Sequence, residues 1–271
     1  MQPTIQINIA AGGDLRELLI AQLSEAGFDG FEEEENNLIA CCSEELFNEI
    51  VLKEILDGHN LTYEKTVIPP QNWNEVWESN FQPVVVDDFV AVRASFHAPV
   101  TGVEHEIIIT PKMSFGTGHH ATTYMMMQQM RGLEFNSMDV FDFGTGTGIL
   151  AILAKQLGAR NVTAIDIDEW SINNAKENFD NNGITGISLM QAETPAIING
   201  QFDIILANIN KNVLLEYIPV LSTQLKKGGF LLLSGLLAAD EPEILLTASQ
   251  NSLFHNTTIA RDKWICILIH A

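Results

Sequence analysis

A glycine-rich turn between an apolar segment and an expected helix contains residues well suited to bind a ligand. The apolar run over 140–143 leads into Gly144, Gly146 and Gly148. Glycine tolerates backbone angles that other residues avoid, and it lets a ligand approach the main chain closely. The loop reads G-x-G-x-G, because Ile149 stands where the dinucleotide pattern G-x-G-x-x-G has its third glycine. The pattern therefore disfavours a pyrophosphate seated on a helix N-terminus.

The next expected strand supplies an acidic partner for this loop. Asp166 follows the apolar segment 162–165, about 20 residues after the glycines, where a carboxylate can accept both hydroxyls of a ribose. An aspartate at a strand end can instead cap the following helix, and Asp168 is available for that role. Loop, spacing and strand context together favour a nucleoside. S-adenosylmethionine fits, because it has no phosphate and its ribose and amino-acid end need a tight loop.

Two further segments offer polar groups near the same edge of the sheet. Asn208 follows an apolar run over 202–207, and its amide carbonyl could hold an amine in line with a methyl sulfonium. Its alternative role is to form the turn. The loop over 111–123 is rich in glycines and hydroxyls and could close over a cofactor. Its adjacent His119 and His120 have no further ligands at useful spacing, so we expect no metal.

A parallel sheet is needed to bring these residues together. From residue 138 onward, near-continuous apolar strands alternate with helices, as in a sheet covered on both faces. Residues 1–68 read as strand, helix, two strands, a helix over 45–56 and a strand, which is the ferredoxin-like order. We therefore expect an α/β protein with a ferredoxin-like α+β domain over 1–68, a linker over 69–83 and a Rossmann-like, mostly parallel, doubly wound domain over 84–271.

Composition narrows the possible partners. Asp and Glu number 35 against 14 Lys and Arg, for a formal net charge of -21. Such a surface repels nucleic-acid phosphates and attracts basic partners, although it can also serve solubility alone. The three cysteines lack zinc-site spacing, there is no signal-peptide pattern, and no apolar run approaches the roughly 20 residues of a membrane helix. We expect a cytoplasmic protein that binds neither DNA nor a membrane.

Several motifs resemble those of the ribosomal protein L11 methyltransferases, the PrmA family. The resemblance rests on F-G-T-G-H-H-A-T-T over 115–123, D-F-G-T-G-T-G-I-L-A over 142–151 with I-D-I-D over 165–168, and A-N-I over 207–209. The connector W-x-x-x-W-x-x-x-F-x-P over 73–83 is similar as well. Many methyltransferases share the glycine loop and its acid, whereas the F-G-T-G loop combined with A-N-I is far more specific.

This resemblance implies a class I methyltransferase domain joined by a flexible linker to a substrate-recognition domain. It implies that S-adenosyl-L-methionine is the cofactor, and that lysines and the N-terminal amine of the basic ribosomal protein L11 are methylated. Asn208 would orient the amine or the cofactor, which makes it the candidate catalytic residue. The family usually has Thr-His-Pro where this chain has H-H-A over 119–121. Carried over by position, and with the loop glycine Gly146 added, the candidate cofactor-binding residues are Phe115, Gly116, Thr117, Thr123, Gly144, Gly146, Asp166 and Asn208.

We expect a monomeric protein-lysine N-methyltransferase without a dedicated general base. A methyltransferase for another protein or a small molecule is the nearest alternative. Nucleobase and glutamine methyltransferases commonly show Asn-Pro-Pro-Tyr where this chain has N-I-N-K over 208–211, which disfavours those targets. Ile149 disfavours a nicotinamide-dependent oxidoreductase. A methyl-transfer assay would distinguish an enzyme from a module that only binds the cofactor.

Overall fold

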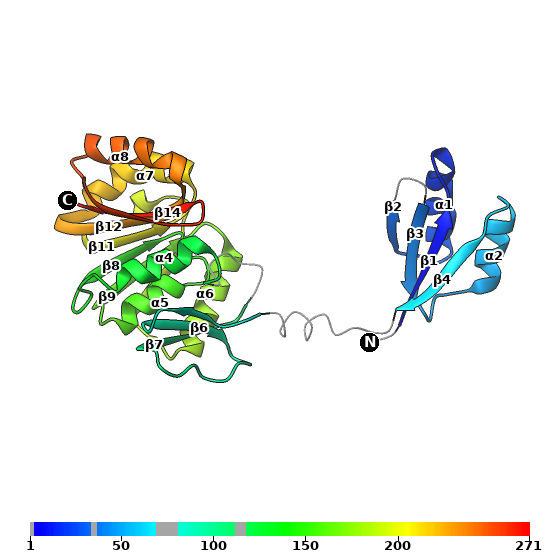
Figure 1. Cartoon of the computed structure of the whole chain (residues 1–271), viewed down its shortest axis with the longest axis horizontal. Coiled ribbons are helices and arrows are strands. Elements are labelled where there is room, and N and C mark those ends of the chain that lie inside the picture. Colours follow the sequence, from blue (N-terminus) through cyan, green and yellow to red (C-terminus); the bar gives the residue numbers. More distant parts are fainter. Residues whose placement is uncertain (1–2, 34–36, 69–80, 112–117) are drawn as a thin grey trace. The chain divides into compact units, whose positions relative to one another are not determined.

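The computed structural model describes residues 3–33, 37–68, 81–111 and 118–271. The chain divides into two compact units, Met1–Asn80 and Phe81–Ala271, and each is described by itself (Figure 1). Residues 69–80, which make up most of the expected linker, lie outside the described residues, and so do its aromatic residues Trp73 and Trp77.

The small unit is built on a four-stranded sheet. Its strand order is β2-β3-β1-β4 and every pair is antiparallel, which is the ferredoxin-like arrangement. Alternate residues of the first strand, Ile5, Ile7 and Ile9, are buried against the helices, as the two-residue period of a half-buried strand requires. The elements are β1 (Thr4–Ala10), α1 (Asp14–Glu25), β2 (Gly30–Glu33), β3 (Asn37–Ser43), α2 (Glu49–Asp57) and β4 (Tyr63–Ile68).

The large unit contains a seven-stranded sheet in the order β10-β9-β8-β11-β12-β14-β13. Neighbouring strands are parallel except where β14 pairs with β12 and β13. The strand order reverses between β8 and β11, and open α/β sheets bind ligands beside the carboxyl ends of strands at such a point. The strands are β8 (Asp139–Phe143), β9 (Asn161–Asp166), β10 (Ile187–Gln191), β11 (Phe202–Asn208), β12 (Leu225–Leu237), β13 (Phe254–Arg261) and β14 (Trp264–His270).

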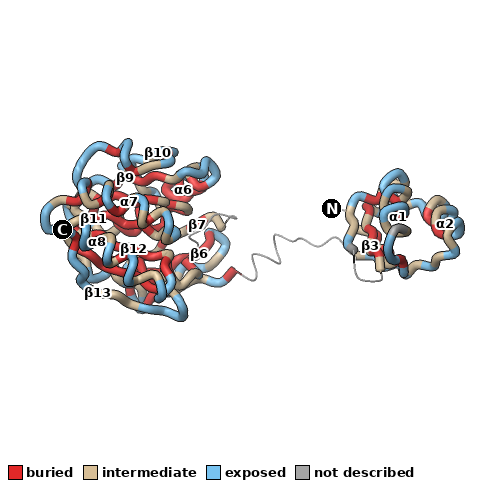
Figure 2. The backbone as a smooth tube through the Cα atoms, turned by 90° about the horizontal axis from the view of Figure 1, so that it is seen from above, coloured by how far each residue is buried: buried red, intermediate tan, exposed pale blue. Residues whose placement is uncertain are grey.

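Helices cover both faces of this sheet. Helices α4, α5 and α6 pack on one face, and α7 and α8 on the other (Figure 1). Figure 2 shows that the buried backbone is concentrated in the central strands between these layers. No helix among the described residues is both long enough and apolar enough to span a membrane. The helices are α4 (Ala121–Met130), α5 (Ile149–Gln156), α6 (Glu169–Asn181), α7 (Lys211–Gln224) and α8 (Glu241–Gln250).

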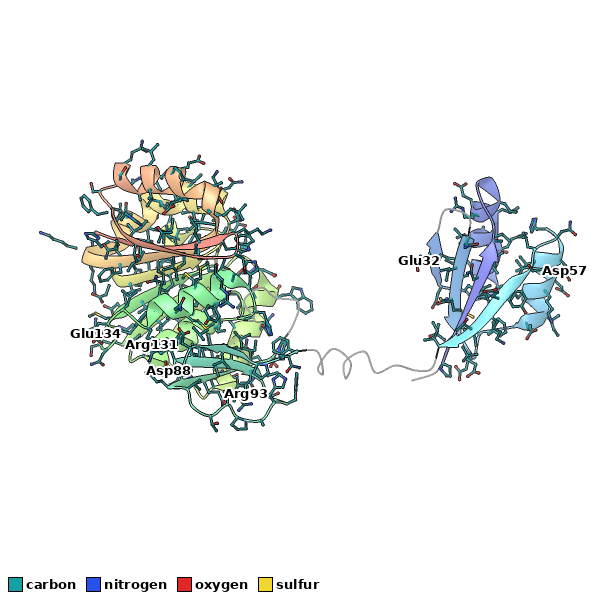
Figure 3. The ribbon with its side chains drawn as sticks, in the orientation of Figure 1. Glu32, Asp57, Asp88, Arg93, Arg131 and Glu134 are labelled. Atoms are coloured by element: carbon teal, nitrogen blue, oxygen red, sulfur yellow. The ribbon has the colours of Figure 1, made fainter. Side chains whose placement is uncertain are left out.

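A separate three-stranded sheet flanks these helices. It consists of β5 (Val84–Val86), β6 (Val90–Ala94) and β7 (His105–Ile109), with β5 antiparallel and β7 parallel to β6. Arg131, at the end of α4, donates to Asp88 at 2.5 Å (Figure 3). It also donates to Glu104 at 2.6 Å. These exposed ion pairs, together with the buried side chains of β6 and β7, attach the small sheet to the helical layer.

Candidate active site

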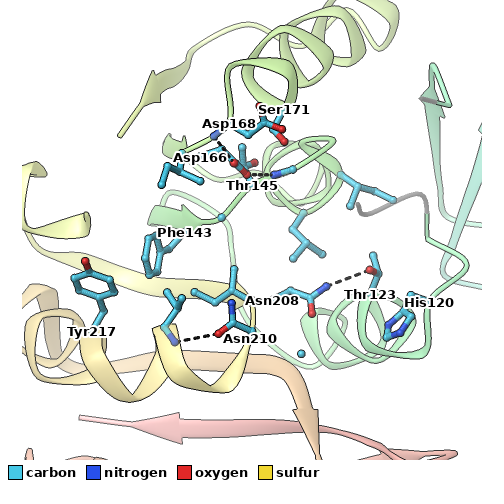
Figure 4. Close-up of a pocket in the computed structure, with 18 of the residues that line it drawn as sticks. His120, Thr123, Phe143, Thr145, Asp166, Asp168, Ser171, Asn208, Asn210 and Tyr217 are labelled. Carbon is cyan, nitrogen blue, oxygen red and sulfur yellow. Dashed lines mark hydrogen bonds between the residues drawn. The ribbon is translucent and has the colours of Figure 1, made fainter. Parts of the chain in front are cut away.

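A cavity of about 800 Å³ opens at the carboxyl ends of the central parallel strands. It is lined by Phe143 of β8, Asp166 of β9 and Asn208 of β11 (Figure 4). The glycine loop between β8 and α5 contributes to the wall, and Thr123 of α4 lies across from it (Figure 4). The cavity therefore lies at the point where the strand order reverses.

Three glycines in the left-handed backbone region shape the loop after β8. Gly144, Gly146 and Gly148 have φ angles of 76°, 54° and 79°, which residues with a side chain rarely adopt. The N–H groups of Gly144 and Thr145 both donate to the carbonyl of Ile165, at 3.0 and 2.9 Å. These bonds attach the loop to the end of β9 and bring it against the carboxylate that follows.

Asp166 ends β9 with both carboxylate oxygens held by main-chain donors. Its Oδ2 accepts from the N–H of Gly146 at 2.8 Å, and its Oδ1 accepts from the N–H of Asp168 at 3.0 Å. Asp168 itself caps α6 by accepting from the N–H of Trp170 at 3.0 Å, which confirms the capping role expected for it. The Asp166 side chain is therefore oriented in advance, and each oxygen retains a lone pair for a further donor.

Asn208 lies at the end of β11 with one of its two polar atoms satisfied. Its Nδ2 donates to the hydroxyl of Thr123 at 3.1 Å. Its Oδ1 is buried and has no hydrogen-bond partner among the described residues. An unsatisfied buried acceptor costs about 1–3 kcal/mol. A donor from a bound molecule would recover that free energy.

Close packing against two glycines fixes the turn that follows Asn208. A Cβ atom on Gly144 would overlap the side chain of Ile209, and one on Gly235 would overlap the main chain of Ile209. Gly235 lies in β12 where the register with β14 shifts, so the strand bends toward the turn. The two glycines therefore let three strands approach closely enough to hold Asn208 in place.

Carboxylates dominate the charge around the cavity. Asp166, Asp168, Glu193 and Glu216 line it, and its described lining includes no lysine or arginine. Low-dielectric walls that carry charge of one sign strengthen the field inside a cleft. The cavity therefore favours a cationic ligand and disfavours a phosphate.

A further carboxyl group lies beneath the glycine loop. Asp142 is buried, and its Oδ2 accepts from the hydroxyl of Thr145 at 2.6 Å. Burial raises the pKa of Asp142 to about 7; the negative charge of Asp166 acts in the same direction, and the hydrogen bond from Thr145 opposes both. Near neutral pH this carboxyl group is therefore divided between its protonated and ionised forms.

Comparison with known proteins identifies the family. A sequence model of the family described as ribosomal protein L11 methyltransferase (PrmA) matches residues 21–271. The chain belongs to this family. A ribosomal protein L11 methyltransferase of Porphyromonas gingivalis is 40% identical over 258 residues, which cover 93% of this chain and 89% of the relative. Another, from Bacteroides fragilis, is 37% identical over 260 residues, which cover 93% of each chain.

A solved structure of the PrmA family supports the same assignment. The crystal structure of ribosomal protein L11 methylase from Lactobacillus delbrueckii subsp. bulgaricus has a TM-score of 0.66 and 32% sequence identity, and the match covers 70% of this chain and 98% of that chain. The family predicted from the motifs and the Rossmann-like α/β fold are thereby confirmed. Family membership makes the chain a class I methyltransferase with S-adenosylmethionine as its cofactor.

The structure of this PrmA family member brings most of the predicted site residues to one cavity. They come from segments far apart in the sequence, and the carboxyl ends of three strands and the first turn of α4 position them. Their roles remain predictions. The residues that line the cavity are Thr123, Gly144, Gly146, Asp166 and Asn208. The other three candidates, Phe115, Gly116 and Thr117, lie outside the described residues.

Two aromatic pairs that line the cavity were not predicted from the sequence. Trp264 of β14 contacts His120 edge to face, with ring centroids 4.6 Å apart, and Tyr217 of α7 contacts Phe143 in the same way at 5.6 Å. His120 also caps α4 by accepting from the N–H of Thr122 at 3.4 Å. No group of three or more metal-ligand side chains occurs within the described ranges. No local pattern links Trp264 or Tyr217 to the site, because tertiary packing alone brings them there.

Proposed function

We propose that this chain transfers methyl groups from S-adenosylmethionine to amino groups of ribosomal protein L11. The curated relatives carry the name of that activity. The observation that carries the proposal is the buried Oδ1 of Asn208, which has no partner in the described structure and lies beside a cavity lined by carboxylates. An amine can supply the donor that this acceptor lacks, and a cationic cofactor is the ligand that such a cavity favours.

The described residues fit this cofactor. The oxygens of Asp166 are oriented to accept the two ribose hydroxyls. Gly144 and Gly146 line the cavity, where the amino-acid end can approach their main chain. The surrounding carboxylates stabilise a sulfonium and an ammonium group. When bound, the cofactor supplies an activated methyl group, so the protein mainly aligns the reactants. Alignment can contribute roughly 7–11 kcal/mol.

The attacking amine must be neutral when it reacts. With an ordinary lysine pKa near 10.4, deprotonation at pH 7 costs about 4.6 kcal/mol. Burial and the positive sulfonium both lower the pKa of the amine and offset part of that cost, whereas the cavity carboxylates act in the opposite direction. Asn208 orients the nitrogen by accepting one N–H at Oδ1, which directs the nitrogen lone pair toward the methyl group. We assign no dedicated general base.

The small unit is the proposed docking site for the basic substrate. Residues 1–80 hold 16 of the 35 acidic residues and 3 of the 14 basic residues, so the negative charge is concentrated in this unit. Complementary charge accelerates encounter and disfavours wrong partners. We therefore propose that residues 1–68 recognise the substrate, that residues 69–83 link the domains and that residues 84–271 carry out the transfer.

The finer features of the reaction follow from the same proposal. We assign lysine side chains and the N-terminal amino group of L11 as the methyl acceptors, and we propose that the enzyme acts as a cytoplasmic monomer that does not bind DNA. An acidic surface and an acidic cavity both support a basic protein substrate over a nucleic acid.

A single experiment tests the proposal. The purified full-length chain is incubated with recombinant L11 and S-adenosylmethionine, and intact-mass spectrometry then detects mass increases in steps of one methyl group. Peptide mapping assigns the modified amines. A basic ribosomal protein of similar size and the demethylated cofactor serve as controls. Methylation of the control protein but not of L11 would contradict the substrate assignment, and the absence of any methylation would contradict the activity.

A further inference from the structure

A row of asparagines on α6 faces the edge of β7. Asn174, Asn178 and Asn182 follow at intervals of four, so they share one helix face, and the first two are fully buried. Asn182, which directly follows the helix, satisfies both main-chain polar groups of Ile108: its Oδ1 accepts from the N–H at 2.8 Å, and its Nδ2 donates to the carbonyl at 2.6 Å. The asparagines therefore take the place of a neighbouring strand beside β7.

Thr110, directly after β7, has each of its polar groups bonded to α6. Its N–H donates to Oδ1 of Asn178 at 2.7 Å, and its carbonyl accepts from Asn174 at 3.2 Å. Its hydroxyl donates to Glu177 at 2.9 Å and accepts from Asn181 at 3.0 Å. The end of β7 is therefore fixed to the helix.

Asn178 differs from its neighbours because it also holds the glycine loop. Its Nδ2 donates to the carbonyl of Thr147 at 2.8 Å, while its Oδ1 holds Thr110. Helix and loop are also in direct contact, because a Cβ atom on Gly148 would lie 2.5 Å from the ring of Phe179. One buried amide therefore joins α6, the glycine loop and the end of β7.

We propose that Asn178 is a positioning residue of the cofactor site, an inference that rests on the proposed function. Asn178 does not line the cavity. It acts through Thr147, which follows Gly146 in the loop, and the N–H of Gly146 donates to the carboxylate of Asp166. Loss of the bond to Thr147 allows the loop to leave the conformation that the cofactor needs. The cost of ordering the loop then offsets part of the free energy of cofactor binding.

Asn182 provides a matched control for this role. It is the same residue type on the same helix face and also bonds to the edge of β7, but none of its described hydrogen bonds reaches the glycine loop. Asn178→Ala and Asn182→Ala should both lower the melting temperature. In Asn178→Ala, the dissociation constant for S-adenosylmethionine measured by calorimetry and the KM for this cofactor should both rise about tenfold or more. In Asn182→Ala, both quantities should change less than about threefold. The kcat of Asn178→Ala at saturating cofactor should fall less than its KM rises.

Asn178→Asp gives a second readout that a purely structural role would not produce. At neutral pH the new carboxylate can still accept from Thr110 but cannot donate to Thr147. At acidic pH the protonated carboxyl group can donate again, so its cofactor affinity should approach that of the wild type as the pH falls. Equal cofactor affinity in the wild type and both Asn178 variants would overturn this inference alone. Failure of the wild type itself to bind S-adenosylmethionine would overturn the proposed function and this inference with it.

Discussion

The two polar atoms of the Asn208 side chain have different surroundings, and that difference predicts how its variants behave. Nδ2 is held by Thr123, whereas Oδ1 is buried and lacks a partner among the described residues. Asn208→Ala removes the acceptor that orients the amine, so kcat should fall about 100-fold, the effect expected for a misaligned reactant. Asn208→Asp keeps the shape but stabilises the protonated amine, so its pH–rate profile should shift to higher pH. Steady-state kinetics with L11 across pH test both, and an unshifted profile would contradict the assigned role.

The buried carboxyl group of Asp142 makes a prediction about stability and pH. Its pKa is about 7 in the folded chain and near 3.9 when unfolded. Between these values the folded state keeps a proton that the unfolded state has lost. The free energy of unfolding therefore falls as the pH rises through this window, and the fall ends above the folded pKa.

The side-chain amide of the Asp142→Asn variant cannot titrate. The free energy of unfolding of this variant should therefore not fall through that pH window. The free energy of unfolding of the variant minus that of the wild type should rise by on the order of 2–4 kcal/mol between pH 4 and pH 8. Urea unfolding at several pH values measures the difference. Only its change with pH is diagnostic, because the new amide shifts the stability by a constant amount at every pH. Parallel pH curves for the two proteins would contradict the raised pKa.

At the level of elements, a comparison of two of the glycines of β12 distinguishes the cost of backbone strain from the cost of steric overlap. Gly228 and Gly235 have φ angles of 77° and 85°, so alanine at either position is similarly strained. A Cβ on Gly228 would meet no atom within 4 Å, whereas one on Gly235 would overlap the main chain of Ile209. Gly228→Ala should cost about 1 kcal/mol, and Gly235→Ala about 2–4 kcal/mol. Gly235→Ala should also lower kcat, because Asn208 directly precedes the displaced Ile209. Equal costs in denaturant unfolding would contradict the proposed overlap.

Patterns local in the sequence predicted the elements well, and long-range packing accounts for most of what they missed. The positions of the glycine loop and of Asp166 at the cavity were predictable, because a buried strand followed by turn residues is a local signal. The helix expected over 45–56 begins instead at Glu49, because Asn48 caps it by accepting from the N–H groups of Ile50 and Val51. The hydrogen bonds of Asn178 were not predictable, because its partners Thr110 and Thr147 lie far away in the sequence. Such partners become visible only once α6 is packed against both.

At the level of the whole molecule, the uneven distribution of charge should determine how the substrate arrives. Because the acidic excess is concentrated in residues 1–80, association with a basic protein should depend on ionic strength. The KM for L11 should rise as salt rises from low to physiological concentration, where the Debye length falls to about 8 Å. The kcat should change less, because salt screens groups enclosed in a cavity less than it screens two proteins that approach each other through solvent.

Two variants with the same change in net charge test which of the two units is responsible for the salt-dependent association with L11. Neutralising three exposed glutamates of the small unit should raise the KM for L11 about 3–10-fold at low salt and flatten its salt dependence. The same charge change on the large unit should have a smaller effect, although the net charge of both variants is equal. The first variant carries Glu17→Gln, Glu25→Gln and Glu45→Gln, and the second carries Glu134→Gln, Asp180→Asn and Asp262→Asn, all at exposed positions. Equal rises in KM would mean that net charge steers the substrate; a larger rise for the first variant would identify the small unit as the surface where L11 first binds.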